Sequence, residues 1–205
     1  NLLSPMFSAG FYYKTFMGPH KSFWKKIYEP LIRRAAGLGK PPKEFKAISS
    51  HLHHNVDIVI VGGGLNGLLA AKSLINTHYD VLLIDPRETW ATANRFPGVK
   101  INHGWPSEVI TKLSPDSKTA VVTLSHDPKL DDQALISALA TDAFYIGSLG
   151  SKKTHNLRIS RLRTEGIKIN QINRIFAPVG LNIKAKTPFE IAISIIAQII
   201  KTYQS

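Results

Sequence analysis

The chain has 205 residues, 43 % of them hydrophobic and none of them cysteine, so it can form one folded domain with a shorter appendage but no disulfide, iron–sulfur site or thiolate nucleophile. Its formal net charge is +12, yet no motif typical of RNA or DNA binding accompanies the basic residues, and we expect no nucleic-acid partner. No apolar run reaches the roughly 18 residues of a membrane span. Because the residues from Asn1 onward also lack the apolar core of a signal peptide, we expect a fragment of a cytoplasmic protein without membrane contact.

Residues 1–55 are predicted to form an arm and a linker. Eight of the 18 aromatic residues lie in the first 28 positions, and the segment carries a net charge of +7. Aromatic surface of this size is normally buried, so we expect the arm to pack on the following domain, on a partner subunit or on a second copy of the chain. A helix is predicted over 22–36, and glycines and prolines at 37–42 indicate a linker. His51, His53 and His54 are candidates for a metal, but a polar segment explains them as well, and no metal site is expected.

Short apolar strands alternate with helices over residues 56–205. Strands are predicted at 57–61, 80–84, 99–102, 119–124, 143–146 and 174–177, and helices at 66–78, 106–113, 130–140, 152–165 and 188–203. The last helix has a clear start signal, with Thr187 as N-cap, Pro188 at the first helical position and Glu190 three residues after the cap. The alternation predicts a doubly wound, Rossmann-like α/β domain with helices on both faces of a parallel sheet in the order 3-2-1-4-5-6.

Gly62, Gly64 and Gly67 form a G-x-G-x-x-G motif between the first strand and the first helix. In such a turn the first glycine permits a tight bend, the second lets a diphosphate approach the backbone, and the third allows close helix–strand packing. Asp85 ends the second strand, about 20 residues further on, where a carboxylate can accept hydrogen bonds from a ribose. The combination predicts a dinucleotide-type site, with Arg87 beside it. A glycine-rich turn without a ligand is the alternative.

Two further groups of candidate residues follow later strands, whose carboxyl ends should share one rim of the sheet. His126 and Asp127 could orient a ligand or exchange a proton, with a hydrogen-bonded turn before Pro128 as the structural alternative. A second phosphate could be held where another helix begins, at Gly147, Ser148, Gly150 and Ser151. An ordinary capped loop is the alternative there.

Asp131 and Asp132 fit the first turn of a helix, where the helix dipole favours negative charge. Further ligands for a metal beside them are not evident from the sequence, so the dipole explains these two carboxylates better than a metal site does.

Seven sequence blocks lie between about residues 81 and 201: DPRE (85–88), WATANRFP (90–97), GWP (104–106), TLSHDPKLDD (123–132), YIGSLGSKKTH (145–155), APVGLNI (177–183) and KTP (186–188). They resemble the C-terminal Rossmann domain of the xanthine dehydrogenase accessory factor family, of the XdhC/CoxI type. The resemblance implies a protein that assists maturation of molybdenum hydroxylases, binds molybdenum cofactor and helps deliver it in sulfurated form to the hydroxylase apoenzyme. The family's cysteine-containing motif is missing, and Lys184 stands where the family has a glycine.

A different family is similar to the first part of the chain. The matching residues are SPMFSAGFYYKTFM (4–17), Trp24, YEPLIRRAAGLG (28–39) and VGGG (61–64). Residues 4 to about 84 resemble the alpha subunit of heterotetrameric sarcosine oxidase, which implies FAD at the glycine turn. The two likenesses meet near 80–88 and indicate a fusion, either natural or introduced when the sequence was assembled, that keeps one complete β-α-β unit.

The leading hypothesis is therefore an XdhC-like accessory protein that holds molybdenum cofactor or a nucleotide without turning over a substrate. A fragment of an FAD-dependent oxidoreductase is the second hypothesis, and a domain that binds NAD(P) is the third.

Overall fold

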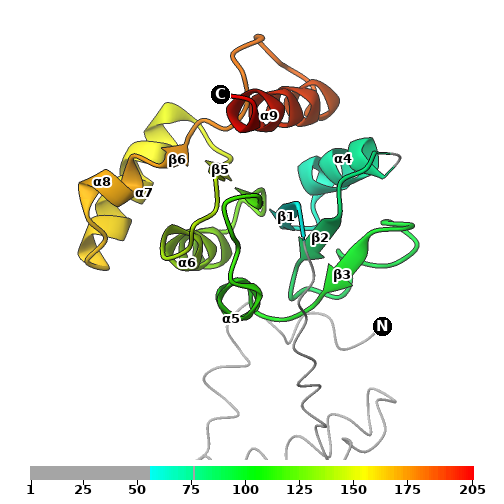
Figure 1. Ribbon diagram of the computed structural model, residues 1–205, viewed down its shortest axis with the longest axis horizontal. Coiled ribbons are helices and arrows are strands. Elements are labelled where there is room, and N and C mark those ends of the chain that lie inside the picture. The colour runs from blue at the N-terminus through cyan, green and yellow to red at the C-terminus, as the bar shows by residue number, and fades with distance from the viewer. Residues whose placement is uncertain (1–55, 76) are drawn as a thin grey trace, which may run out of the picture. The chain divides into compact units, whose positions relative to one another are not determined.

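A computed structural model describes residues 56–75 and 77–205, and in this part the predicted doubly wound α/β domain is confirmed (Figure 1). Six parallel strands form one sheet in the predicted order, β3-β2-β1-β4-β5-β6. Their bounds are Ile58–Val61 (β1), Val81–Ile84 (β2), Lys100–Asn102 (β3), Ala120–Thr123 (β4), Tyr145–Ser148 (β5) and Ile175–Phe176 (β6). The predictions for the arm and for His51, His53 and His54 lie outside the described residues.

The central strands form because their side chains are apolar on both faces of the sheet. Every residue of β1, β4 and β5 is buried. Ile58 and Ile60 of β1 belong to one hydrophobic cluster, whereas Val59 and Val61 belong to another, as expected when successive side chains point to opposite faces. The sheet therefore separates two apolar cores, each of which needs a layer of helices.

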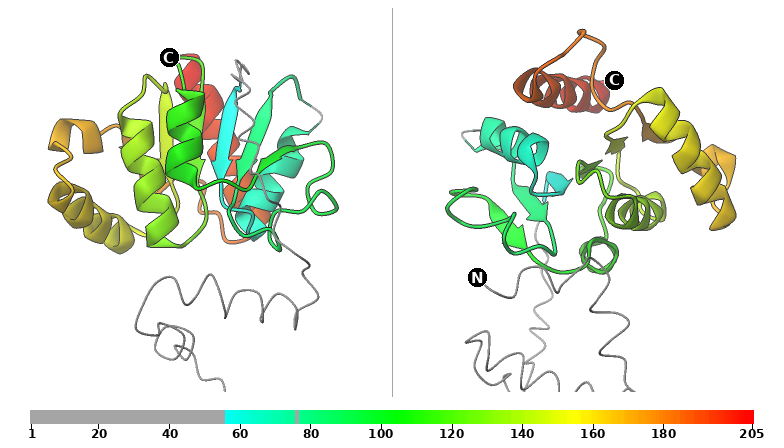
Figure 2. Two further views of the ribbon diagram at one scale, coloured as in Figure 1. Left: turned by 90° about the horizontal axis from the view of Figure 1, so that it is seen from below. Right: turned by 180° about the vertical axis from the view of Figure 1, so that it is seen from behind.

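Those helical layers lie on opposite faces of the sheet: Figure 1 shows them on either side of the strands, and the left view of Figure 2 shows α5 and α6 in front of the sheet with α9 behind it. Helices α4 (Leu65–Leu74) and α9 (Pro188–Tyr203) pack together on one face. On the other face α5 (Pro106–Leu113) packs on α6 (Pro128–Leu139), which contacts α7 (Lys152–Thr164). The short α8 (Ile169–Ile172) follows α7. Within the described part of the chain, no helix combines the length and apolar character needed to cross a membrane.

Helix starts follow the capping residues. The predicted start of α9 is confirmed, because the Glu190 amide donates to Thr187 Oγ1 at 3.3 Å and the Thr187 amide donates to the Glu190 carboxylate at 2.9 Å. Helix α6 begins at Pro128, two residues before its predicted start, because Asp127 is its N-cap and accepts a hydrogen bond from the Lys129 amide at 2.9 Å. Local capping therefore sets both helix entries.

Other boundaries differ from the prediction for identifiable reasons. Helix α4 ends at Leu74 rather than near His78, since the amide and hydroxyl of Thr77 both donate to the Leu74 carbonyl. Strand β5 lies two residues later than predicted because it pairs with β4 through Tyr145 to Ser148. Helix α8 was not predicted, and its four residues are too few to show a helical period.

Lys184 has a φ of 57°, in the left-handed region that costs a residue with a side chain about 1 kcal/mol or more relative to glycine. Replacing Lys184 with glycine is therefore expected to raise the free energy of unfolding by about 1 kcal/mol. Lys186→Gly removes the same charge two positions away and should lower the free energy of unfolding slightly. Chemical denaturation of both variants tests the difference, and a stabilising Lys186→Gly or a destabilising Lys184→Gly would contradict it.

Candidate nucleotide-binding site

The glycine turn between β1 and α4 is packed at two of its glycines and open at the third. A side chain at Gly62, where φ is 110°, would place Cβ 2.6 Å from the Cα of Ser125. At Gly67 the added Cβ would lie 1.9 Å from the carbonyl oxygen of Gly62. At Gly64 it would meet no atom within 4 Å. Gly62 and Gly67 thus serve packing, while Gly64 borders free space.

The first turn of α4 presents backbone donors to that space. The Gly62 amide donates to the Ile84 carbonyl at 2.9 Å, and the Gly63 amide donates to Asp85 Oδ2 at 2.7 Å. For the amides of Gly64, Leu65 and Asn66, no acceptor is found among residues 56–75 and 77–205. The first turn of α4 also holds no acidic side chain. Exposed amides at the positive end of a helix dipole favour an anion such as a phosphate group.

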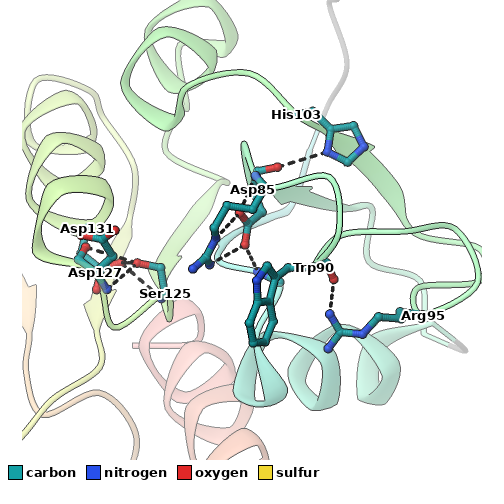
Figure 3. Close-up of polar contacts among 9 residues, drawn as sticks. Asp85, Trp90, Arg95, His103, Ser125, Asp127 and Asp131 are labelled. Atoms are coloured by element: carbon teal, nitrogen blue, oxygen red, sulfur yellow. Dashed lines mark hydrogen bonds and ion pairs between the residues drawn. The ribbon is translucent and has the colours of Figure 1, made fainter. Parts of the chain in front are cut away.

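Asp85 lies at the end of β2 with its side chain fully buried, and it braces the glycine turn (Figure 3). Oδ1 accepts the amide and Nε of Arg87, and Oδ2 accepts the Gly63 amide and Arg87 Nη2, all at 2.7 to 3.0 Å. Burial alone would raise the pKa of Asp85, but the hydrogen bonds from Arg87 and Gly63 outweigh burial and lower it. The carboxylate therefore fixes the positions of Gly63 and Arg87 through hydrogen bonds. A hydrogen bond from a ribose to Asp85 remains a prediction.

His126 connects the loop after β4 to the first turn of α4. Its φ is 62°, and Nε2 lies 3.2 Å from Nδ2 of Asn66. The Oδ1 atom of Asn66 is buried and has no hydrogen-bond partner in the described part of the chain. His126 is exposed and lies beside Asn66 in the first turn of α4, and its contact with a ligand remains a prediction.

Asp127 and Asp131 stabilise the same loop through hydrogen bonds with Ser125. Asp127 caps α6, and its amide donates to Ser125 Oγ at 3.0 Å. Ser125 Oγ in turn donates to Asp131 Oδ1 at 2.7 Å, and Figure 3 shows the three side chains gathered at the start of α6. Burial raises the pKa of Asp131, and the hydrogen bonds from Ser125 oppose the rise only in part. Asp131 therefore orders the loop from inside the fold, a role that its place in a helix's first turn did not reveal.

The predicted phosphate loop from Gly147 to Ser151 is divided by the structure. Gly147 and Ser148 belong to β5, and the buried Ser148 Oγ lies 2.6 Å from Thr123 Oγ1. A Cβ at Gly147 would come within 2.7 Å of Val179, so this glycine serves packing. Gly150, with a φ of 143°, and Ser151, which accepts the Thr154 amide at 3.1 Å, form the loop that leads into α7. Only the latter two residues lie in the loop that was predicted to hold a second phosphate.

Sequence reasoning singled out neither Trp90 nor Arg158. Trp90 is 46 % exposed. Its backbone lies next to the glycine turn, because a Cβ at Gly63 would lie 3.1 Å from the Trp90 carbonyl oxygen. Arg158 of α7 is 3 % exposed, donates to the Leu149 carbonyl at 3.1 Å and lies 3.5 Å from Asp132. Local sequence could have placed Trp90 in the loop after β2, but no signal marks a buried arginine on a strongly polar helix.

The comparisons confirm both resemblances. A model of the XdhC Rossmann domain matches residues 58–199. Sarcosine oxidase subunit alpha of Rhizobium meliloti (strain 1021) is 45 % identical over 89 residues, covering 41 % of this chain and 8 % of that protein. The molybdenum cofactor insertion chaperone PaoD of Escherichia coli (strain K12) is 37 % identical over 84 residues, covering 41 % of this chain and 26 % of that protein. A crystal structure of a xanthine dehydrogenase from Bacillus halodurans superposes with a TM-score of 0.62 at 28 % identity, covering 72 % of this chain and 42 % of that one.

The chain thus spans less than half the length of each of these three proteins. The match to the Rossmann domain model starts at residue 58. It includes β1 and α4, which precede the sequence blocks that first indicated this family.

Proposed function

Because this chain belongs to the XdhC Rossmann domain family, we propose that it is an accessory protein that holds molybdenum cofactor and helps deliver it to the apoenzyme of a molybdenum hydroxylase of the xanthine dehydrogenase type. PaoD, which is similar over 84 residues, is a molybdenum cofactor insertion chaperone. The similar solved structure is described as a xanthine dehydrogenase. Both relatives support the proposal that this chain acts with molybdenum cofactor.

The observation that carries the proposal is the free space in front of Gly64, together with the amides of Gly64, Leu65 and Asn66. These donors suit the phosphate groups of a pterin cofactor or of its dinucleotide form. His126, which lies beside the Asn66 side chain, offers a further polar contact at the same helix turn. The residues present therefore fit the phosphate-bearing part of the cofactor.

The metal itself is not expected to be ligated by the described residues. The chain has no cysteine, and residues 56–75 and 77–205 contain no cluster of three His, Asp or Glu side chains that could hold a metal ion. Molybdenum cofactor supplies a redox-active metal centre once it is in the hydroxylase. In this proposal the chain binds and orients the cofactor through its phosphate groups. Gly64 has no side chain, so these groups can reach the backbone amides.

Retention of molybdenum tests this proposal. The purified full chain is incubated with molybdenum cofactor, passed over a desalting column and analysed for molybdenum by mass spectrometry. We expect near-stoichiometric molybdenum on the wild-type chain and at least about a tenfold weaker affinity for Gly64→Ala, because the added methyl group fills the space next to the amides. Transfer to a hydroxylase apoenzyme should restore its activity. A wild-type chain that retains no molybdenum would overturn the proposal.

A flavin oxidoreductase fragment is the second candidate function, favoured by the 45 % identity to sarcosine oxidase subunit alpha over 89 residues. In that case FAD would place its diphosphate at the same amides of α4. A yellow preparation with a flavin absorption spectrum and no retained molybdenum would support this candidate over the accessory role.

A further inference from the structure

Trp90 has a large aromatic side chain that is 46 % exposed, and its backbone lies next to Gly63 of the glycine turn. Its amide donates to the Arg87 carbonyl at 2.9 Å, and the next residue, Ala91, is buried and would lie 3.3 Å from a Cβ at Gly63. The backbone on both sides of Trp90 is therefore anchored, so the exposure of the indole follows from the fold of the loop.

Two arginines accompany the exposed ring. The guanidinium carbons of Arg87 and Arg95 lie 5.4 and 5.6 Å from the Trp90 ring centroid, within the range of cation–π interactions. Arg87 is held by Asp85, and Arg95 donates through Nη1 to the Trp90 carbonyl. Figure 3 shows the indole with Arg95 beside it. An exposed π surface with two fixed cations favours a flat heterocycle that carries negative charge.

We propose that Trp90 stacks the heterocyclic base of a nucleotide whose diphosphate lies on the amides of Gly64, Leu65 and Asn66. Arg95 would then contact the phosphates or the edge of the base. This inference rests on the proposed function and specifies its ligand: the site selects a nucleoside diphosphate group, and therefore the dinucleotide form of the pterin cofactor over the form without a nucleotide.

The position of Trp90 distinguishes it from the other exposed tryptophan of the described residues. Trp105 is 41 % exposed but lies at the start of α5, after β3. The backbone of Trp90, in contrast, lies next to Gly63, the residue before the open glycine. Since the two rings are similarly exposed, Trp105 is a matched control for the loss of an exposed indole.

Isothermal titration of the full chain with ADP, CDP and inorganic pyrophosphate tests the proposal. Stacking of one base on an aromatic ring corresponds to a loss of about 5- to 150-fold in affinity when the ring is removed. We expect a loss in this range for ADP and CDP in Trp90→Ala, with little change for pyrophosphate. Trp90→Phe should keep most of the affinity, and Trp105→Ala should bind all three like the wild type.

Tryptophan fluorescence gives a second measurement that does not require the alanine variant to fold. ADP should quench the emission of the wild type and of Trp105→Phe but not that of Trp90→Phe. Equal affinity of Trp90→Ala and wild type for ADP, or wild-type binding of ADP no tighter than that of pyrophosphate, would overturn the stacking inference and leave the accessory role standing. If Trp90→Ala selectively lost affinity for ADP while the wild-type chain retained no molybdenum, the result would support stacking and contradict the accessory role.

Discussion

Replacing Gly67 with alanine is expected to lower the free energy of unfolding by about 3 kcal/mol or more. The reason is steric, since the new Cβ would lie 1.9 Å from the carbonyl oxygen of Gly62, and the two residues are fixed by the sheet and by α4. Relief would require α4 to move away from β1, which would open the apolar cluster beneath it. Thermal and urea denaturation followed by circular dichroism measure the loss.

Gly64→Ala is the matched control for this prediction. Gly64 has a φ of −66°, which alanine adopts easily, and a Cβ there would meet no atom within 4 Å. We expect a change in unfolding free energy of less than about 1 kcal/mol, because only the N-cap preference of glycine over alanine is lost. The two variants therefore separate stability from binding: Gly67→Ala should lose stability, and Gly64→Ala should lose affinity for the ligand. A Gly67→Ala protein as stable as Gly64→Ala would show that the turn is not packed as described.

Arg87→Ala is expected to destabilise the protein by about 2–3 kcal/mol at neutral pH. The change removes two of the four hydrogen bonds to a fully buried carboxylate and leaves the charge of Asp85 with only the amides of Gly63 and Arg87. About a third of the Arg87 side chain, 36 %, is exposed, so water can replace part of what is lost, and the effect should fall below that of a fully enclosed pair.

The pH dependence of this loss has a definite sign. In the wild type the pKa of Asp85 is below its ordinary value despite burial, so its contribution to stability is present above that ordinary value of 3.8 and is lost as the pH falls through the folded pKa. Without the Arg87 side chain the largest effect that lowers the pKa of Asp85 is lost, so this pKa should rise. The difference in unfolding free energy between wild type and Arg87→Ala should therefore be largest near pH 7 and shrink as the pH falls below about 5.

Lys100→Ala supplies the control for the ion pair. Lys100 Nζ lies 3.1 Å from Asp80 Oδ1, and the two side chains are 49 % and 55 % exposed. Exposed pairs contribute little, so a loss below about 0.5 kcal/mol is expected, with weak dependence on pH. If urea denaturation gave similar losses for Lys100→Ala and Arg87→Ala, the buried pair would not brace the glycine turn.

Local sequence signals were enough to predict the architecture of residues 56–205. Runs such as IVIV at 58–61 and AVVT at 120–123 are apolar at every position or nearly so, which only a strand covered on both faces tolerates. The glycine spacing located the turn, and Thr187, Pro188 and Glu190 fixed the start of α9. These signals are local, because a cap, a tight turn and a side-chain period each involve residues within a few positions of one another.

The contacts of the polar residues at the rim, in contrast, depend on segments that are distant in the sequence. Asp85 is buried against Gly63 and Arg87, from 22 and 2 positions away, and these contacts were not part of the prediction that it binds a ribose. Ser148 was expected in a phosphate loop, yet pairing of β5 with β4 buries it beside Thr123. The backbone of Trp90 lies next to the glycine turn through a contact between segments more than 20 residues apart. Burial and hydrogen-bond partners arise from such distant contacts, and no local pattern of residue types encodes them.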